Sequence, residues 1–530
     1  MQSNPLLGTQ LKALLPDQSV DCDPDACALA AQDLFSDGPP VVAVLRPRDM
    51  VELIAAVKVA TDAGATLFPR GGGMSYTSGY LSKGADANSA VTVDIRALNR
   101  IIEINVTDMY VLVEAGCTWA ALDGALREKG LRTPFWGPLS GIQASVGGAL
   151  SQNAAFWGSG CHGAAADSVL GLEVILADGT VLRSGSLGRD HALPFFRHHG
   201  PDLTGIFLGD CGAFGIKARV SLRLIERAET HAVATFGFTT VEDLIPAISA
   251  ISRAGLASEH FAFDRGLKSA RLKRASLRED MAQLIGLMRN SGSLTQALSN
   301  AVRTVFAGRR FLDRIDFPLH VMVEGRSDAA VAADLRALRK IIASHSGVEV
   351  EPSIPRILQA TPFGPLNGIV GPRGERWVPV HVVIPHSRAQ DAYRSAMNIF
   401  ADMKDDFARH DIQTGCLFAG VGTNGFLLEL MFFWPDRLLD LHQRTLSETV
   451  KARLTQFPPN EEGRSVVIEA RHRLRECFAE LGGCHFQIGK FYPYMDGLNP
   501  RAAELIKQIK RTLDPDSHMN PGSLGLGQDV

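Results

Sequence analysis

Glycine is grouped rather than scattered in the first half of this chain. The 530 residues include 51 glycines, and many of these fall in four short segments, at 71–79, 147–148, 158–163 and 209–215. Glycine adopts backbone conformations that other residues avoid, and it lets a ligand or another backbone approach the main chain closely. We therefore expect the N-terminal half to contain several loops that turn tightly or touch a bound ligand.

The first segment, residues 68–79, has the sequence Phe-Pro-Arg-Gly-Gly-Gly-Met-Ser-Tyr-Thr-Ser-Gly and follows a short predicted strand. Three glycines in a row let successive backbone N–H groups point into one concavity, and such a nest binds phosphate oxygens without a lysine. The segment is neither a Walker loop nor a dinucleotide fingerprint, because no Gly-Lys-Ser/Thr follows and Tyr76 stands where the third glycine belongs. A flexible surface loop is the alternative interpretation.

Two further segments favour a ligand. Residues 145–153 begin a predicted helix with small residues, so we expect its first N–H groups and its positive dipole end to be free for an anion. Residues 209–216, with three more glycines, precede a predicted strand at Lys217–Leu224. Together, the three segments predict a cofactor that carries phosphate.

The length indicates two domains. Residues 41–224 alternate short strands with helices, which is typical of an α+β unit. We expect helices at Met50–Asp62 and Trp119–Lys129, and Asp178-Gly179 predicts a hairpin with a type I′ turn. The strands expected in this half are Val41–Leu45, Thr66–Phe68, Val91–Ile95, Ile101–Asn105, Val111–Ala115, Leu172–Leu176 and Val181–Ser184.

Residues 228–471 form a second predicted unit, and the tail at 485–524 contains a predicted helix at Arg501–Leu513. Within the second unit, residues 265–310 have helical periodicity and many basic residues. A solvated helix face explains them; the alternative is a weak membrane-surface contact that delivers electrons to a quinone. Strands are expected at His320–Glu324, Val378–Ile384 and Phe426–Phe433.

Composition narrows the class of protein. Hydrophobic residues make up 45% of the chain and charged residues 21%, and the formal net charge of −3 argues against a nucleic-acid partner. The eight cysteines form no Cys-x-x-Cys pair, which excludes zinc-ribbon and thioredoxin-like sites. We find neither a secretory signal nor a run of apolar residues that could span a membrane. These features predict a soluble, cytoplasmic protein with reduced thiols.

The order of the motifs resembles the vanillyl-alcohol oxidase/p-cresol methylhydroxylase family of FAD enzymes. The motifs are Arg-Gly-Gly-Gly-x-Ser at 70–75, Ser-Val-Gly-Gly with Asn153, Asp-Ser-Val-Leu-Gly-Leu-Glu-Val-Ile-Leu-Ala-Asp-Gly at 167–179, and Gly-x-x-Gly-x-x-Gly-Ile at 209–216. Leu513-Asp514-Pro515 with Met519-Asn520-Pro521-Gly522 resembles the closing motif of that family. The resemblance is good over the N-terminal half of the chain, which we call the FAD half, moderate over the tail and loose in between.

The resemblance implies an α+β fold with a PCMH-type FAD-binding domain of two α+β subdomains. A cap domain follows, with an antiparallel sheet covered by helices. We expect the FAD-binding domain at 1–228, with its core at about 38–226, the cap at 229–470 and a C-terminal return at 471–530. By resemblance, the cofactor-binding residues are Pro69, Arg70, Gly71, Gly72, Gly73, Met74, Ser75, Gly79, Ser145, Val146, Gly147, Gly148, Asn153, Gly163, Gly215, Ile216 and Asn520.

The chain departs from its relatives at two places. Some relatives attach FAD through a histidine after the first glycines, where this chain has Met74, so we expect non-covalent FAD; a link through His442 of the cap stays open. Relatives that oxidise 2-hydroxy acids often hold a metal with histidines around a glycine-rich stretch. The counterpart here, Phe418–Phe426, has no histidine, so we expect no metal.

A flavin accepts hydride at N5, so the protein must position the substrate and remove a proton. The stretch 482–494 lies where the chain is expected to return to the flavin, and its candidate catalytic residues are His485, Lys490, Tyr492 and Tyr494. If it forms a strand, His485, Gln487 and Gly489 share one face. The same residues can also be ordinary rim residues.

Candidate substrate contacts on predicted cap strands are Arg376, His381, Asn424 and Glu429, with solvent-facing polar residues as the alternative. We expect an FAD-dependent dehydrogenase or oxidase acting on a hydroxyl-bearing small molecule, with phenolic or benzylic alcohols favoured. A D-lactate- or glycolate-like 2-hydroxy acid is the second interpretation, and a non-catalytic flavin-binding protein is the third. Oxygen, a cytochrome and a quinone all stay open as electron acceptor, and a homodimer is expected.

Overall fold

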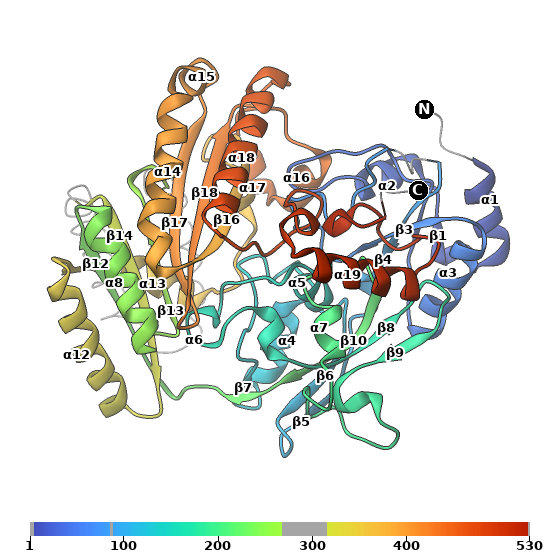
Figure 1. Cartoon of the computed structure of the whole chain (residues 1–530), viewed down its shortest axis with the longest axis horizontal. Helices are drawn as coiled ribbons and strands as arrows, with labels where there is room; N and C mark the ends of the chain where they lie inside the picture. Colours follow the sequence, from blue (N-terminus) through green and yellow to red (C-terminus); the bar gives the residue numbers. More distant parts are fainter. Residues whose placement is uncertain (1–4, 85–87, 268–314, 528–530) are drawn as a thin grey trace.

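Two main sheets, of four and five strands, and a two-stranded pair lie in the N-terminal half of the chain, and a larger sheet forms its middle (Figure 1). The structure is a computed structural model, and it describes residues 5–84, 88–267 and 315–527. Most of the basic stretch predicted at 265–310 therefore lies outside the described residues. The mixture of parallel and antiparallel strands with helices is the α+β class that the sequence predicts.

The first sheet has the order β1-β2-β4-β3, with β1 at Val20–Asp21, β2 at Ala43–Leu45, β4 at Ala90–Asp94 and β3 at Thr66–Arg70. β2, β4 and β3 are parallel, and helix α3 (Met50–Asp62) connects β2 to β3. Asp49 caps α3, because its side chain accepts a hydrogen bond from the Glu52 N–H at 2.9 Å. The first glycine segment leaves β3 at its carboxyl end, the edge where ligands bind in parallel sheets.

The second sheet is antiparallel throughout and has the order β5-β6-β10-β8-β9. Its predicted hairpin forms, but only Gly179 has a positive φ, of 80°, so the turn is not type I′, which needs two such residues. The strands are β5 (Ile101–Asn105), β6 (Tyr110–Glu114), β8 (Val169–Ile175), β9 (Val181–Arg183) and β10 (Ile216–Arg223).

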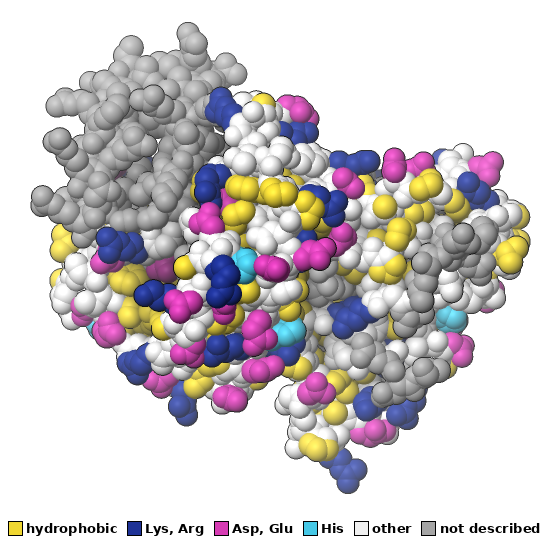
Figure 2. Space-filling model, turned by 90° about the horizontal axis from the view of Figure 1, so that it is seen from above, with side chains coloured by type: hydrophobic (Ala, Val, Ile, Leu, Met, Phe, Trp, Pro, Cys, Tyr) yellow, Lys and Arg dark blue, Asp and Glu magenta, His cyan; other side chains and the backbone are white. Residues whose placement is uncertain are grey.

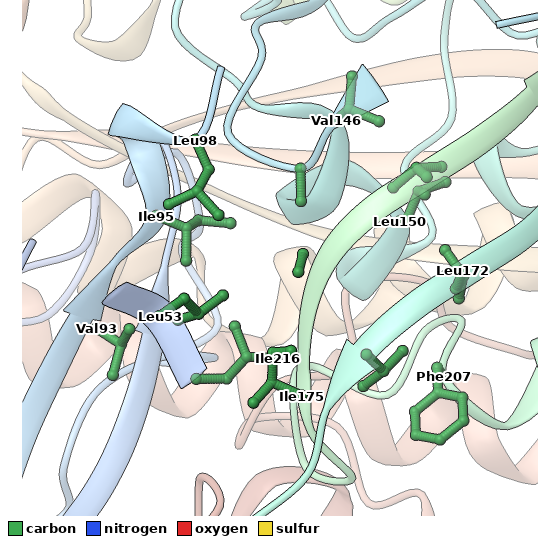
Figure 3. Packing of buried hydrophobic residues seen from close by; sticks show 14 of the residues in the cluster. Leu53, Val93, Ile95, Leu98, Val146, Leu150, Leu172, Ile175, Phe207 and Ile216 are labelled. Atoms are coloured by element: carbon green, nitrogen blue, oxygen red, sulfur yellow. The ribbon is translucent and has the colours of Figure 1, made fainter. Parts of the chain in front are cut away.

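One hydrophobic core joins these two sheets (Figure 3). Leu53 of α3 and Val93 of β4 lie on one side of it, and Leu172 of β8 lies on the other. Helix α5 (Val146–Gln152) supplies Val146 and Leu150 to the same core. The glycine segments are therefore loops on a single packed body.

The cap sheet is antiparallel and has the order β15-β12-β14-β13-β17-β18-β16. Its strands are β12 (Thr230–Phe238), β13 (Glu259–Phe263), β14 (Phe317–Gly325), β15 (Val348–Val350), β16 (Arg376–Pro385), β17 (Gln413–Val421) and β18 (Gly425–Trp434). The helices packed on one face are α8 (Val241–Ala254), α12 (Asp328–Ser344), α14 (Ala389–Asp402) and α18 (Glu461–Glu480). Figure 1 shows this layer beside the FAD half.

The strands of the cap sheet have two different apolar faces. On β18, Leu428 and Phe432 pack in the core under the helices. Met431 and Phe433 alternate with them and belong to a second cluster, which also contains Trp136 and other aromatic residues of the N-terminal half. The face opposite the helices is therefore turned toward the FAD half.

The shorter elements connect these layers. They are α1 (Pro5–Leu14), α2 (Pro24–Ala30), α4 (Trp119–Arg127), β7 (Leu131–Arg132), α6 (Ser159–His162), α7 (Leu203–Ile206), β11 (Ile225–Glu226), α13 (Ser353–Ala360), α15 (Lys404–Arg409), α16 (Asp440–Thr445), α17 (Glu448–Lys451) and α19 (Pro500–Leu513). β11 pairs with β7 just before the chain enters the cap at β12.

The C-terminal return begins later than predicted. A boundary at residue 470 would cut α18, which runs to Glu480 and packs on α14 and the cap sheet. The return then crosses to the FAD half, where Met519 forms a parallel bridge with Leu67 of β3. Residues 485–489 do not form a strand, because Gln487 and Gly489 have φ values of 52° and 56°, so the shared face considered for His485, Gln487 and Gly489 does not exist.

Charges of both signs are interspersed on the face drawn in Figure 2, outside its grey atoms. In the part of the chain that the structure describes, each helix is too short or too polar to cross a bilayer.

Candidate active site

A deep cleft opens where the glycine segments of the N-terminal half meet the C-terminal return. It holds about 870 Å³ of empty space, part of which is open to solvent. Gln487 is the residue through which the return reaches its wall. The predicted cofactor residues that line it are Pro69, Arg70, Gly71, Gly72, Gly73, Met74, Ser75, Gly79, Ser145, Gly147, Gly148, Gly215 and Ile216.

The first glycine loop fits a diphosphate. Within the described part of the chain, the backbone N–H groups of residues 71–75 donate no hydrogen bond to protein, although these residues line the cleft. The guanidinium of Arg70 is buried in the same wall, and its Nε also has no partner among the described residues. Buried donors are normally paired, so this cluster calls for an anionic acceptor. FAD supplies one.

Two positions of this loop require glycine, one because of a close contact within the protein and the other because of its backbone conformation. A Cβ at Gly72 would lie 2.1 Å from the Gln143 carbonyl oxygen, and Gly73 has a φ of +74°. The loop at 140–145 therefore packs directly on the nest. The glycines bring two loops together as well as opening the cleft to a ligand.

The start of helix α5 differs from the prediction. The N–H groups of Val146 and Gly147 donate to the carbonyl oxygens of Cys117 and Ala115, at 2.8 and 2.7 Å. The Gly148 N–H donates to the Oγ of Ser145, the N-cap residue, at 3.2 Å. These donors are already used, so the expectation of free N–H groups here is wrong.

Four predicted cofactor residues do not line this cleft. Val146 points into the hydrophobic core (Figure 3). Asn153 ends α5 in the left-handed conformation, and its Oδ1 accepts a hydrogen bond from the Ala166 N–H at 3.1 Å. Gly163 has a φ of +81° in a turn against Asp167. Each shapes the loops around the cleft.

Asn520 is the fourth of these residues, and it ties the tail to the cleft loops. It is buried, and its Nδ2 donates to the carbonyl oxygens of Gly79 and Cys211 at 2.6 and 2.5 Å. The closing motif thus holds two loops that line the cleft.

His485 precedes Gln487, the residue of the return that lines the cleft, by two positions in the chain. Its Nδ1 is 2.8 Å from the His381 carbonyl oxygen, so Nδ1 carries the proton and Nε2 carries the lone pair. Nε2 is buried without a partner among the described residues, and the ring stacks on Tyr492 with centroids 4.0 Å apart. Burial lowers the pKa of His485 to about 4. The imidazole is therefore neutral at neutral pH and able to accept a proton.

His381 lies on the cap-sheet face that is turned toward the FAD half. It is fully buried, and neither ring nitrogen has a partner in the described part of the chain. Its ring stacks on Phe486 at 4.0 Å, and its backbone N–H donates to the Tyr492 hydroxyl at 3.0 Å. Burial holds the pKa of His381 well below its usual value. Opposite it in the sheet lies Glu429, half-buried on β18.

Sequence reasoning missed Tyr76 and Gln487 as site residues. Tyr76 follows the glycine loop directly, is buried, and packs edge-on against Trp377 and His381 of the cap. Burial, and next the charge of Glu429, raises the pKa of Tyr76, whose hydroxyl is hydrogen-bonded to Gln487. Tyr76 thus joins the nest loop to the face of the cap sheet that is turned toward the FAD half. The only sequence signal was its place after three glycines.

Two predicted catalytic residues have other surroundings. The Lys490 ammonium donates to the Leu81 carbonyl oxygen at 2.5 Å and lies over the Phe68 ring. Tyr494 is partly buried against the core of the FAD half, whereas Tyr492 belongs to the cap core. Of the four predicted catalytic residues, Tyr492 and His485 contact His381: the Tyr492 ring lies against the His381 ring, and His485 Nδ1 donates to the His381 carbonyl oxygen.

Two predicted substrate contacts are also misplaced. Arg376 is buried on the helix side of the cap, where its guanidinium lies over Trp434 and donates to the Phe35 carbonyl oxygen at 2.5 Å. Asn424 is exposed in the turn between β17 and β18. Arg376 was misassigned because both faces of its strand are buried, so the sequence pattern does not indicate to which face a side chain points. In the structure the Arg376 side chain faces the helices.

His442 is not placed to link FAD. It is buried in the cap, and its Nδ1 accepts a hydrogen bond from the Leu439 N–H at 3.1 Å. No group of three His, Cys, Asp or Glu side chains among the described residues could hold a metal ion.

Comparisons with known proteins agree with this geometry. The family model for an FAD binding domain matches residues 41–185, and the model for the C-terminal domain of FAD linked oxidases matches residues 491–524. Over 219 residues the chain is 31% identical to a probable mitochondrial D-lactate dehydrogenase of Danio rerio, covering 41% of this chain and 42% of the relative. Over 189 residues it is 28% identical to the glycolate oxidase subunit GlcD of Bacillus subtilis, covering 36% and 38%. The chain thus spans about two fifths of the length of these relatives.

Solved structures match over nearly the whole chain. p-Cresol methylhydroxylase with substrate bound has a TM-score of 0.75 at 15% identity and covers 99% of this chain and 97% of its own. Alkyldihydroxyacetonephosphate synthase has a TM-score of 0.70 at 15% identity and covers 98% and 85%. At this identity the likeness concerns the fold.

The fold, the cleft and the matched models define a flavoprotein with an FAD-binding domain, a cap sheet and a C-terminal return. The chain thus contains an FAD binding domain and a segment that matches the C-terminal domain of FAD linked oxidases, with FAD as the cofactor, and its overall fold is similar to that of p-cresol methylhydroxylase.

Proposed function

We propose that this chain oxidises a hydroxyl-bearing small molecule, with a phenolic or benzylic alcohol as the preferred substrate. FAD supplies the hydride acceptor when it is bound. The observation that supports this proposal best is the pair His381 and His485: both ring nitrogens of His381 and the Nε2 of His485 are buried without a partner among the described residues, next to an aromatic cluster. Such donors and acceptors call for a polar group of a ligand inside an apolar pocket.

His485 is the general base in this proposal. Its Nδ1–H is held by the His381 carbonyl oxygen, which leaves the Nε2 lone pair for the proton of the substrate hydroxyl. The stacked Tyr492 ring fixes the plane of the imidazole. Positioning by two contacts keeps the base in one tautomer and one orientation.

The aromatic surface indicates the body of the substrate. The cluster between the cap sheet and the FAD half consists of aromatic and other apolar side chains, so a substrate ring that reached it would be held by offset or edge-on packing. Its buried members are Trp136, Trp157, Phe261, Phe263, Leu267, Met322, Leu417, Leu427, Met431, Phe433 and Phe486.

Glu429 argues against a carboxylate substrate. It lies opposite His381 on the same sheet face and acts electrostatically on Tyr76 and Tyr492. A carboxylate side chain repels an anionic substrate in a buried site. The second candidate, a 2-hydroxy acid, is favoured by the names of the sequence relatives, which include D-lactate dehydrogenases and a glycolate oxidase subunit.

Anaerobic flavin reduction tests the proposal. The purified protein is mixed without oxygen with a benzylic alcohol, a para-alkylphenol, D-lactate or glycolate, and bleaching of the flavin absorbance is followed. We expect an aromatic alcohol to reduce the flavin at least tenfold faster than either acid, before and after treatment with a chelator. Faster reduction by D-lactate or glycolate would establish the second candidate. Flavin that no substrate bleaches would favour a non-catalytic flavin-binding protein.

A further inference from the structure

A buried ammonium group faces the FAD cleft and was not predicted from the sequence. Lys217 is the second residue of β10, its side chain is 2% exposed, and it lines the cleft. Its Nζ lies 2.5 Å from Oδ1 of Asp210, which is also buried. A buried lysine is rare unless all its hydrogen bonds are made.

The hydrogen bonds of Lys217 are incomplete. An ammonium group has three N–H donors, and within the described part of the chain Asp210 is the one acceptor for Lys217. Lys510, buried nearby, provides a comparison: its Nζ donates to the Ala213 carbonyl oxygen, to Asp514 and to the Met519 carbonyl oxygen, at 2.5–2.8 Å. Lys510 is therefore a saturated structural cation, whereas Lys217 has two donors to spare and a cavity in front of it.

The surroundings of Lys217 identify the kind of acceptor. The turn at 209–212 that positions Asp210 touches the first glycine loop, since a Cβ at Gly212 would lie 3.1 Å from Pro69 Cγ. The same cleft contains the unpaired N–H groups of residues 71–75 and the guanidinium of Arg70. Asp210 balances one of the two cations, so the cleft wall has a surplus of positive charge and of N–H donors. That surplus suits a group with two negative charges.

We propose that the Lys217 ammonium binds the diphosphate of FAD, with Asp210 holding it in the cleft wall. This inference rests on FAD as the cofactor and is independent of the substrate. Charge-assisted hydrogen bonds between an ammonium and a phosphate are stronger than neutral ones.

The test measures FAD affinity in apoprotein from which flavin has been removed, by titration of flavin fluorescence. Because Lys217→Met alone would leave Asp210 buried without a counter-charge, the informative variant is Asp210→Asn with Lys217→Met, which removes both charges. We expect its Kd for FAD to rise about 10- to 100-fold, the range for a charge-assisted hydrogen bond. The thermal midpoint of the apoprotein shows whether the variant is folded.

Two further variants make the test specific. Asp210→Asn with Lys217→Gln restores N–H donors at residue 217 without the charge; if it binds FAD as tightly as wild type, the acceptor is a neutral hydroxyl and the assignment to the diphosphate is overturned. Lys510→Met with Asp514→Asn removes the saturated pair, and its Kd for FAD should change less than tenfold. Equal FAD affinity of wild type and the Met variant would also overturn the proposal. If wild-type apoprotein takes up no FAD, the cofactor assignment itself fails.

Discussion

At the scale of single residues, His485 is the group on which the proposed chemistry depends most. Replacing His485 by Ala removes the lone pair that faces the site but leaves the glycine loops untouched, so FAD should stay bound while flavin reduction slows. General base catalysis contributes about 10²–10⁴-fold, and we expect a loss in that range, measured by anaerobic stopped-flow absorbance. His472→Ala is the matched control, because this histidine stacks on Phe491 of the same region without touching His381. A loss below tenfold would make His485 a structural residue.

The pH dependence of flavin reduction gives an independent readout. Burial lowers the pKa of His485 to about 4, so the base form persists above that pH and is lost as the pH falls through it. The wild-type rate should therefore be level from neutral pH to about 5 and decline near 4, not near the ordinary imidazole value of about 6.5. A decline centred at 6–7 would place the base elsewhere.

A site residue could be predicted only where both its side-chain type and its place in the expected fold pointed to a role. His485 could be predicted because a histidine in the segment that returns to the flavin is a natural candidate for the general base. Arg376 looked equivalent on its strand, yet its side chain points to the helix side, where it lies over Trp434. Tyr76 and Lys217 were missed because their roles depend on contacts across the fold, with the cap sheet and with the turn at 209–212.

At the scale of loops and helices, the two glycine segments should respond differently to a methyl group. In Gly72→Ala the Cβ meets main-chain atoms of Gln143, at 2.1 and 2.7 Å, which cannot move aside cheaply. We expect a loss of about 1–3 kcal/mol of unfolding free energy in the apoprotein, the usual cost of overpacking, with weaker FAD binding as well. Urea unfolding of the apoprotein and FAD titration measure the two effects.

Gly148→Ala is the partner experiment. Here the Cβ contacts only the Ser145 Oγ, at 3.0 Å, and the residue is inside helix α5. Alanine is preferred over glycine in a helix by about 0.5–1 kcal/mol, so apoprotein stability should hold while FAD affinity falls, because the methyl group enters the cleft. If FAD affinity is unchanged, this wall of the cleft does not contact the cofactor.

Elements with strong local signals were predicted well. Helix α3 and strand β5 have the predicted bounds, because a capped amphipathic repeat and a short β-rich run are decided locally. The return segment does not form a strand at 485–489, because Gln487 has a positive φ, and no sequence pattern indicates a positive φ for glutamine. The prediction of free N–H groups at the start of α5 was wrong, because the carbonyl oxygens of Ala115 and Cys117, which are distant in sequence, accept hydrogen bonds from these groups.

At the scale of the whole molecule, the resemblance predicted the architecture and the order of the domains. The sequence placed the cap boundary inside α18, because the polar helix surface near residue 470 hides its packing on the cap. The homodimer and the cytoplasmic location depend on surfaces and partners outside the cleft and stay predictions, and the choice among oxygen, a cytochrome and a quinone as electron acceptor stays open.

Buried histidines should make the folded protein sensitive to acid. His260 and His442 are 2% and 0% exposed, and burial lowers their pKa values to about 4 and about 3. An unfolded chain binds these protons at the ordinary value of about 6.5, so between 6.5 and 4 the unfolded state takes up more protons than the folded state. Stability is therefore complete above pH 6.5 and falls as the pH drops. By linkage each residue removes about 2 kcal/mol between pH 7 and pH 5.

Urea unfolding of the apoprotein at pH 7 and pH 5, followed by circular dichroism, measures this loss. The variant His442→Gln removes one titrating ring and should show a smaller difference between the two pH values, by about 2 kcal/mol. His410→Gln is the control for exchanging an imidazole ring for an amide, since this half-buried histidine directly follows α15 and lies outside the cap core. An equal pH dependence of wild type and His442→Gln would show that His442 takes up its proton as readily in the folded as in the unfolded state, and that the cap tolerates a charge at this buried position.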